Sequence, residues 1–408
     1  MKYTPEEVMQ FIREEDVKFI RMAFCDVYSR QHNVAVMADE LQRAFAHGVA
    51  VDASSIEGFG GDVRSDLLLY PDGSTLIQLP WRPQHGRVAH MFCNIRCPDG
   101  TPFAGDTRRV LQDAVAAADA AGYSFSFSAE MEFYLFKLNE NGARTMEPYD
   151  EAGYMDIAPE DKGENVRREI CLTLEEMGIC PESSHHESGP GQNEIDFRYS
   201  DPLHAADNAV TFHAVVRTIA ARNGLWADFS PRPLPQAPGN GMHINFSVQG
   251  GSGGDPMPSV IAGILEQIGG MTLFLNPRPE SYDRLGRDKA PAYVSWAREN
   301  RSQLIRIPVQ RGADYRAELR SPDSLANPYL AYALLIYAGL DGIQRGLKPP
   351  ESMECNLFTA LPEQLAGLQR LPASLEEAVA AASESAFIRK SLPPEIVSAY
   401  CGGQAAER

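Results

Sequence analysis

The sequence of 408 residues lacks a basic excess, and it has no long apolar run. Its 37 lysines and arginines face 55 aspartates and glutamates, so the formal net charge is −18. Proteins bind nucleic acid through a basic face, which an acidic chain does not readily offer, so we expect no nucleic-acid partner. No apolar run approaches the length that crosses a bilayer, and residues 1–11 do not have the pattern of a signal peptide. We therefore expect no membrane partner.

The sequence also lacks a cysteine framework and a phosphate-binding P-loop. Its seven cysteines are scattered, and Cys93 and Cys97 have no second pair at the spacing of zinc ligands. An odd number of unpatterned cysteines is typical of reduced thiols in a cytosolic protein, so a cytoplasmic location is predicted. Because no GxxxxGK[ST] motif is present, any nucleotide must bind to another scaffold.

The length is more than one hydrophobic core usually holds, so two domains are predicted. Residues 1–100 contain short strand-like stretches between turn signals, which is typical of a small α+β domain. The remaining residues, 101–408, form the larger predicted domain. Its helices are predicted at 107–121, 204–222, 257–274 and 325–345, and a further one begins at Ser374.

Four stretches of the larger domain alternate between apolar and polar residues. They are Tyr123–Phe136, Asn193–Tyr199, Met242–Val248 and Tyr315–Leu319. Successive side chains on a strand point to opposite faces, so each stretch would have a core face and a polar face. A sheet with one wet face is common, but these polar faces carry Glu, His, Asn and Arg and no Lys. We predict an antiparallel sheet with a groove lined by carboxylates and arginines.

Such a groove has a defined chemistry. Converging carboxylates repel one another and stay partly protonated unless cations lie between them. Oxygen ligands with at most one imidazole favour Mg²⁺ or Mn²⁺ over zinc. Arginines would add bidentate donors for phosphate and carboxylate groups. The candidates are Arg301, Arg306, Arg316 and Arg320. Metal ions and arginines around one point favour phosphoryl transfer.

Several motifs, in order along the chain, resemble those of glutamine synthetases. They are the paired-glutamate strand Ser128–Phe133, the second carboxylate motif His185–Glu194, the glycine-rich stretch Gly239–Ser247, and the arginine motifs Asn300–Pro308 and Arg316–Asp323. The resemblance implies an α+β fold. A β-grasp-like domain at 1–100 would precede a glutamine synthetase/guanido-kinase-like catalytic domain at 101–408, in which helices back an antiparallel sheet.

The resemblance also implies ligands and residue roles. ATP would be the co-substrate, with two Mg²⁺ or Mn²⁺ ions in each site. The implied metal ligands are Glu130, Glu132, Glu187, Glu194, His243 and Glu318. The implied ATP-binding residues are Glu182, Asn245, Ser247, Arg306 and Arg316. The implied substrate-binding residues are Arg284, Gly239 and Glu187. The implied catalytic residues are Asp52, Arg301 and Arg320, with Asp52 supplied by a neighbouring subunit of a ring dodecamer.

Some of these residues have plainer interpretations. Arg284 follows a predicted loop and could be solvated. Asp52 begins an Asp-Ala-Ser-Ser stretch, which is also cap chemistry. His185 and His186 are interpreted as residues that shape the turn before Glu187.

Several positions depart from the family pattern, among them Asn245, which replaces a frequent histidine. Lys289 stands before Ala290-Pro291, where glutamine synthetases carry a glutamate that helps to deprotonate ammonium. Pro238 replaces a usual asparagine of the glycine-rich stretch. Phe358 replaces the tyrosine that is adenylylated in some bacterial enzymes, which excludes that modification there.

The predicted activity is therefore ATP-dependent activation of a carboxylate, the glutamate side chain first of all, as an acyl phosphate that ammonia converts to glutamine. The first alternative is a ligase that joins γ-glutamyl to an organic amine such as a polyamine, which Lys289 and Pro238 favour. The second alternative is a non-catalytic relative. The presence of all six implied metal ligands argues against the non-catalytic alternative.

Overall fold

A computed structural model describes residues 3–60, 65–81, 85–251, 253–309 and 315–402. It divides the chain into two compact units. The first comprises residues 1–110 with 172–179, and the second comprises 111–171 with 180–408.

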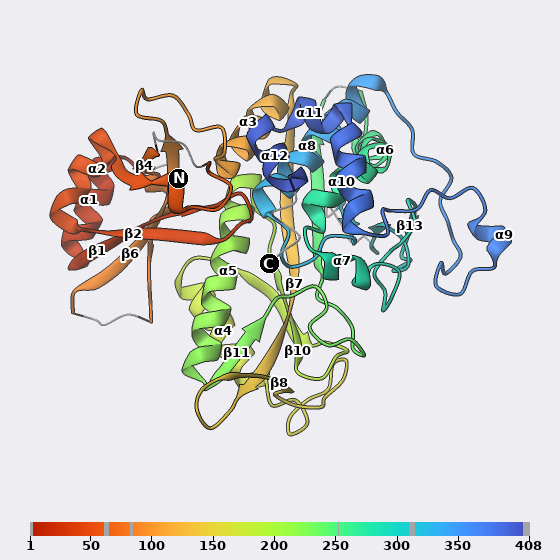
Figure 1. The fold of residues 1–408 in the computed structure, drawn as a ribbon, viewed down its shortest axis with the longest axis horizontal. Helices are drawn as coiled ribbons and strands as arrows, with labels where there is room; N and C mark the ends of the chain where they lie inside the picture. The colour runs from red at the N-terminus through yellow and green to blue at the C-terminus, as the bar shows by residue number, and fades with distance from the viewer. Residues whose placement is uncertain (1–2, 61–64, 82–84, 252, 310–314, 403–408) are drawn as a thin grey trace. The chain divides into compact units, whose positions relative to one another are not determined.

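The N-terminal unit is built on a six-stranded sheet. The order along it is β2 (Gln31–Met37), β1 (Val17–Cys25), β6 (Arg87–Arg96), β4 (Asp66–Pro71) and β3 (Val49–Asp52), and β5 (Ile77–Gln78) pairs with β6. The β1–β6 pair is parallel, and the other pairs are antiparallel. Helix α1 (Pro5–Glu14) contacts β1, and α2 (Leu41–His47) contacts β4 (Figure 1).

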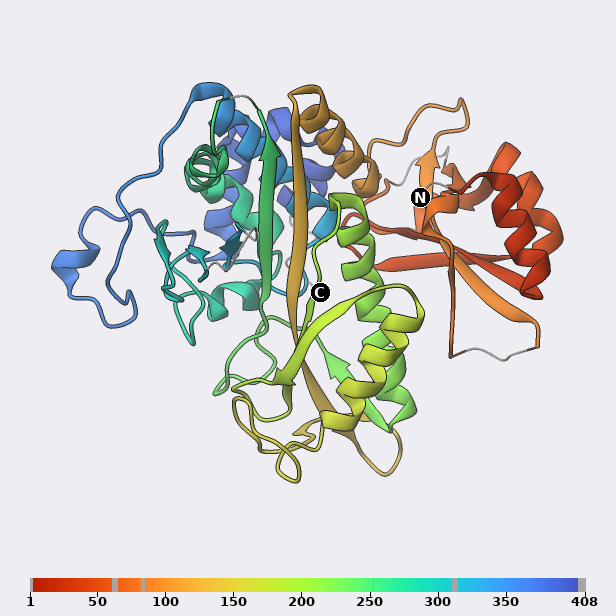
Figure 2. The same cartoon turned by 180° about the vertical axis from the view of Figure 1, so that it is seen from behind.

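The catalytic unit contains a nine-stranded sheet. Its order is β13 (Trp296–Arg298), β14 (Ile305–Ile307), β15 (Ala317–Leu319), β12 (Met242–Gly250), β7 (Tyr123–Leu138), β10 (Gln192–Phe197) and β9 (Pro181–His186). Strands β8 (Arg144–Pro148) and β11 (Leu225–Asp228) also pair with β7. Every pair is antiparallel except β13–β14. Figure 2 shows β7 and β12 running side by side.

Helices cover this sheet and form much of the core. They are α3 (Thr107–Ala120), α4 (Glu164–Glu176), α5 (Pro202–Arg222), α6 (Met257–Leu275), α7 (Pro279–Arg284), α8 (Pro328–Arg345), α9 (Pro362–Leu365), α10 (Leu375–Glu384), α11 (Ala386–Ser391) and α12 (Pro394–Cys401). The Phe127 ring of β7 stacks on the Tyr332 ring of α8, with ring centroids 4.5 Å apart. Helices α6 and α8 approach closely because Gly263 and Gly342 meet there: a Cβ on either glycine would lie 2.1 Å from a carbonyl oxygen of the other helix.

Helix α6 is long and apolar enough to cross a membrane by length and composition, contrary to the expectation that no apolar run approaches that length. However, 67% of its most apolar window is buried inside the protein. Its neighbours are α8 and α10. We interpret α6 as a core helix.

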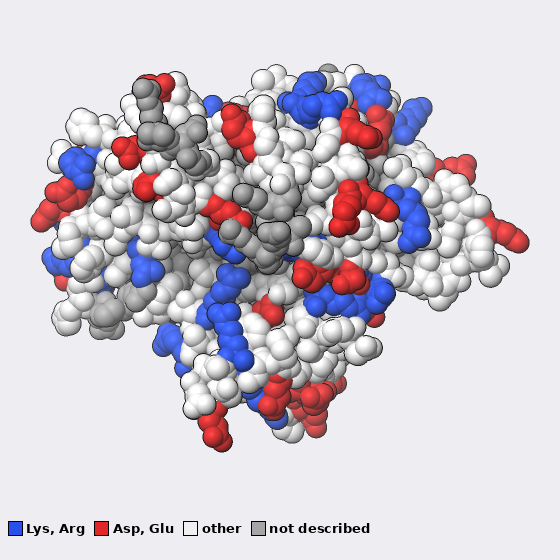
Figure 3. All heavy atoms as spheres, viewed as in Figure 1, with Lys and Arg blue, Asp and Glu red and all other residues white. Residues whose placement is uncertain are grey.

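The face of the molecule shown in Figure 3 carries acidic and basic side chains interspersed.

The predicted helices match the structure to within a few residues, but the strands differ in two ways. The stretch predicted from Tyr315 pairs only over Ala317–Leu319, and the stretch from Asn193 ends at Phe197. The expected polar face is also not uniformly wet. Glu132 and Glu194 are buried.

Candidate active site

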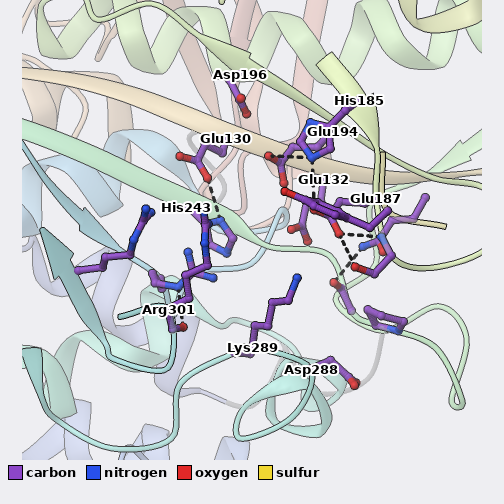
Figure 4. A pocket seen from close by; sticks show the side chains of 18 of the residues that line it. Glu130, Glu132, His185, Glu187, Glu194, Asp196, His243, Asp288, Lys289 and Arg301 are labelled. Atoms are coloured by element: carbon purple, nitrogen blue, oxygen red, sulfur yellow. Dashed lines mark hydrogen bonds and ion pairs between the residues drawn. The ribbon is translucent and has the colours of Figure 1, made fainter. Parts of the chain in front are cut away.

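A cavity of about 390 Å³ lies within the catalytic unit (Figure 4). Strands β7, β9, β10, β12 and β14 and nearby loops supply its walls. It brings together most of the predicted site residues. These are Glu130, Glu132, Glu187, Glu194, Gly239, His243, Asn245, Arg284, Arg301, Arg306, Arg316 and Arg320. The predicted groove is therefore present, and it is a partly enclosed cavity.

Strand register explains why carboxylates so far apart in the sequence meet. Glu132 of β7 pairs with Glu194 of β10. Glu130 pairs with Asp196 on one side and with His243 of β12 on the other. Directly opposed residues of neighbouring strands share a face, so the register gathers these side chains on one side of the sheet.

Two neighbours on β12 orient the Glu130 carboxylate. The His243 Nδ1 atom lies 3.1 Å from Glu130 Oε2, and the Asn245 amide donates a hydrogen bond of 2.9 Å to Glu130 Oε1. His243 Nδ1 also lies 3.7 Å from Glu318 Oε1. A single imidazole thus lies between two carboxylates.

The clustered carboxylates resist ionisation. Burial and the charge of Glu187 raise the pKa of Glu132 to about 7. Burial and the charge of Glu132 raise the pKa of Glu194 well above its usual value. Burial and the charge of Glu130 raise the pKa of Asp196 to about 6. Without a bound cation, negative charges on Glu132, Glu194 and Asp196 would repel one another, and the surrounding positive charges do not fully compensate them.

Glu187 behaves differently. Burial opposes its ionisation, but hydrogen bonds from His185 and Ser188 and the nearby charge of Lys289 bring its pKa down to about 2. The Ser188 amide donates to Glu187 Oε2 at 2.7 Å. Glu187 is therefore the carboxylate of this cluster that is best prepared to carry a permanent charge.

The donor set fits divalent cations. Ligand atoms of Glu130, Glu194 and His243 all lie within 4.8 Å of one another, and so do those of His185, Glu187 and Glu194. Carboxylate oxygens with one imidazole match Mg²⁺ or Mn²⁺ better than zinc. His185, interpreted from the sequence as a turn residue, lines the cavity instead.

Glu318 lies just behind the cavity and forms ion pairs with Arg306 and Arg320. It is fully buried and accepts a 2.5 Å hydrogen bond from Arg306 Nη1, and Arg320 pairs with its other oxygen. Burial opposes the charge of Arg320, but Glu318 outweighs it, so the Arg320 pKa is raised. The pair holds the Arg320 head in place.

Arg284 is not the solvated loop residue that its sequence context allowed. It is the last residue of α7 and is 3% exposed. Its guanidinium donates to the Ser321 carbonyl oxygen at 2.8 Å. Gly239 packs directly against it, since a Cβ there would lie 2.3 Å from the Pro231 carbonyl oxygen and 2.9 Å from Arg284 Cγ. This close approach requires glycine.

Four predicted site residues are not among those that line the cavity, and Glu318, described above, is one of them. Glu182 is exposed on β9, and Ser247 is half-buried on β12. Asp52 belongs to the other unit. Its side chain caps the turn Ala53–Ser55 and accepts a 2.9 Å hydrogen bond from the Ser54 amide, as the cap interpretation predicted.

Tyr154 and Lys289 form a further part of the site. The Lys289 ammonium lies 4.9 Å from the centroid of the Tyr154 ring. The His185 ring is perpendicular to the same tyrosine ring, with ring centroids 5.4 Å apart. Sequence reasoning singled out Lys289 but missed Tyr154, because no pattern connects residue 154 with the loop at 289.

His186 supports the loop that carries Glu187. It is fully buried, with Nε2 2.8 Å from Asp150 Oδ1 and Nδ1 2.6 Å from the Glu187 carbonyl oxygen. Asp150 also accepts a hydrogen bond of 3.0 Å from the Gly191 amide. The structural interpretation of His186 agrees with these contacts.

The fold and the cavity define a class: an enzyme that combines a β-grasp unit with a catalytic sheet bearing clustered carboxylates and arginines. Comparison with known proteins identifies the family. The model of the glutamine synthetase beta-Grasp domain matches residues 16–98, and that of the glutamine synthetase catalytic domain matches 104–408. The chain belongs to the glutamine synthetase family, whose members are ATP-dependent ligases that require a divalent metal. The predicted family and fold class are confirmed.

Relatives match along nearly the whole chain. A glutamine synthetase of Clostridium saccharobutylicum is 44% identical, over 100% of this chain and 95% of the relative. One of Methanosarcina mazei is 43% identical, over 97% and 92%. A solved structure titled as a GmaS/ADP complex has a TM-score of 0.87 and 26% identity, and the match covers 98% of this chain and 94% of the other.

Proposed function

We propose that this protein makes glutamine from glutamate, ammonia and ATP. The observation that carries the proposal is the convergence of the carboxylates, two imidazoles and five arginines on one cavity. Relatives named glutamine synthetase support the same reaction. ATP would phosphorylate the glutamate side chain, and ammonia would then displace phosphate from the acyl phosphate.

The arginines would bind and orient the reacting groups. Arg284 and Arg320 are buried and held by hydrogen bonds, so they are prepared to bind the carboxylates of the acid substrate, with the Gly239 backbone near its amino group. Arg301 would stabilise the transferring phosphoryl group. The residues proposed to contact ATP are Glu182, Asn245, Ser247, Arg306 and Arg316. The solved neighbour titled as an ADP complex supports a nucleotide at this fold.

The six residues Glu130, Glu132, Glu187, Glu194, His243 and Glu318 are proposed to hold two ions, Mg²⁺ or Mn²⁺. Bound ions would screen the phosphate oxygens and orient an in-line transfer. The protein's own carboxylates would give up their protons as the ions bind, because a cation removes the repulsion that raises their pKa values.

We further propose a cytoplasmic ring dodecamer in which Asp52 of one subunit serves the site of its neighbour. Asp52 would attract the amine and help to deprotonate it. The domain boundary is proposed near residue 100, which lies between the two segments that the family models match.

Binding of ATP tests the catalytic interpretation. Thermal unfolding should be measured with ATP, with and without Mg²⁺. The parent should be stabilised only when both are present, and the double variant Glu132→Ala/Glu318→Ala should lose this effect. If the parent shows no Mg²⁺-dependent stabilisation by ATP, the chain is a non-catalytic relative.

Lys289 favours a second candidate, ligation of γ-glutamyl to an organic amine. Its ammonium stands beside Tyr154 and Glu187, where it would repel an ammonium ion. Phosphate release should be compared for ammonia and for a panel of amines, polyamines included. Ammonia outcompeting every amine would reject this candidate. Lys289→Glu should raise turnover with ammonia, whereas the exposed Lys348→Glu should not.

A further inference from the structure

A second cavity, of about 650 Å³, lies in the catalytic unit next to the active site. Four of its lining side chains are cationic, and one is acidic. The cationic ones are Arg232, Arg287, Lys289 and Arg370, and the acidic one is Asp288. In a chain with a net charge of −18, a cavity with this balance is unexpected.

Asp288, the acidic residue of this lining, already forms an ion pair within the cavity. Asp288 Oδ2 lies 3.4 Å from Arg232 Nη2. The Arg232 guanidinium also donates to the carbonyl oxygens of Asp283 and Pro235, at 3.1 Å each. Arg232 and Asp288 therefore offset each other and hold the surrounding loops together. The remaining positive charge of the cavity lies on Arg287, Arg370 and Lys289.

Arg287 and Arg370 form no ion pair among the residues that the structure describes, whereas the charge of Lys289 also acts on Glu187. Arg370 lies over the Tyr293 ring, with its guanidinium carbon 5.4 Å from the ring centroid. Lys289 lies over Tyr154. Arg287 is exposed and forms no ion pair within the described ranges. A cavity with several unpaired guanidinium groups attracts anions, because planar forks of donors fit carboxylate and phosphate oxygens.

The two cavities share a wall. Asp288 and Lys289 line both of them. Hydrogen bonds close the loop that carries them: Gly286 N to Ala290 O at 3.0 Å and Ala290 N to Arg287 O at 2.8 Å. Asp288 and Lys289 have φ angles of 47° and 70°, a left-handed conformation that is uncommon for residues other than glycine. An anion in the second cavity would thus lie directly behind the loop that presents Lys289 to the active site.

We propose that this second cavity is a binding site for a small, multiply charged carboxylate or phosphate anion. Arg287 and Arg370 bind its oxygens, and Lys289 adds a third positive charge from the shared wall. Tyr293, Leu357 and Phe358 give the cavity an apolar side that accepts a short carbon skeleton. This site lies outside the active-site cavity, because Arg287 and Arg370 do not line that cavity.

Calorimetric titration of the metal-free protein tests the site without any need for ligase activity. Citrate probes the carboxylate class, and pyrophosphate probes the phosphate class, with sodium chloride at matched ionic strength as the reference. At least one of the two anions should bind. Binding should weaken at least tenfold in Arg287→Ser/Arg370→Ser, whose replaced side chains are exposed. Circular dichroism checks that this variant is folded.

Two control variants locate the binding. Arg222→Ser removes an exposed arginine elsewhere, and Arg301→Ala removes an arginine of the active-site cavity alone. Both should bind the anion as the parent does. The proposal is overturned if neither anion binds, if the double variant retains parental affinity, or if Arg301→Ala weakens binding as much as the double variant does.

Discussion

Two clusters of the same residue types lie on neighbouring stretches of the catalytic unit and have opposite properties. In the first, Asp150, Asp161 and His186 are buried within 4.8 Å of one another. In the second, His185, Glu187 and Glu194 are equally close. His185 and His186 are adjacent in the sequence, but strand β9 sends them to different clusters.

The first cluster is closed because every acid in it has a partner. Arg167 forms hydrogen bonds of 3.1 and 2.6 Å to the two oxygens of Asp161. Both ring nitrogens of His186 are engaged, one by Asp150 and the other by the Glu187 carbonyl oxygen. No donor atom of this imidazole is left for a metal ion. The first cluster is structural despite its metal-like composition.

The second cluster is open. Burial and the charges of Glu132 and Asp196 raise the pKa of its Glu194 well above the usual value, whereas hydrogen bonds keep the pKa of Glu187 low. The comparison teaches that clustered acids indicate function when the fold leaves their charge uncompensated. Composition alone does not distinguish the two clusters.

The largest effect is expected from breaking the closed cluster. Asp161→Asn would leave Arg167 buried without its carboxylate, which costs about 3–5 kcal/mol of unfolding free energy. Urea denaturation measures the loss. The exposed Glu160→Gln should change stability by less than about 0.5 kcal/mol. A loss below about 1 kcal/mol in Asp161→Asn would show that the pair is not structural.

In the open cluster, Glu194→Gln should lower activity on the order of 10²-fold or more, because a lost metal ligand removes several kcal/mol of charge stabilisation. The stability of the metal-free protein should not fall, because burial and Glu132 already disfavour a charge at this position and glutamine carries none. Steady-state kinetics and urea denaturation check the two parts. Marked destabilisation would mean that Glu194 belongs to a structural network.

The adjacent histidines sharpen the comparison. His186→Gln should destabilise the protein by about 1–3 kcal/mol, because buried acceptors lose a partner. It should also reduce Mg²⁺ affinity about 10–100-fold through the loop of Glu187. His185→Gln should weaken Mg²⁺ binding with little effect on stability. Equal stability losses in both variants would contradict the division into two clusters.

A pH-dependent effect concerns His90 in the N-terminal unit, whose buried Nδ1 atom has no hydrogen-bond partner among the described residues. Burial, with the charge of Arg21, lowers its pKa from 6.5 to about 4. Between these values the unfolded chain binds the extra proton, so stability should fall as pH falls from 6.5 to 4, by up to about 1.4 kcal/mol per pH unit.

Urea denaturation at pH 7 and at pH 5 measures this dependence. His90→Leu should flatten it in that window. An unchanged pH dependence in the variant would assign the effect to other groups. His186, which is buried with partners on both nitrogens, has a raised pKa instead and should contribute in the opposite sense.

Much of the architecture was predictable because it depends on local patterns. The capping box of Thr4 and Glu7 begins α1, and Ser374 caps α10. Alternation identified β7 and β12 and assigned Glu130 and His243 to one face. The position of Arg284 was not predictable, because its burial depends on Gly239 and Ser321, which are distant in the sequence.

The sequence by itself determined the family, the helices and which residues could share a strand face, because periodicity and motifs are local properties. Only the tertiary structure decided which acids were neutralised and which faced one another. Strand register and loop packing set the distances between charges, and the energy of a buried charge depends on those distances.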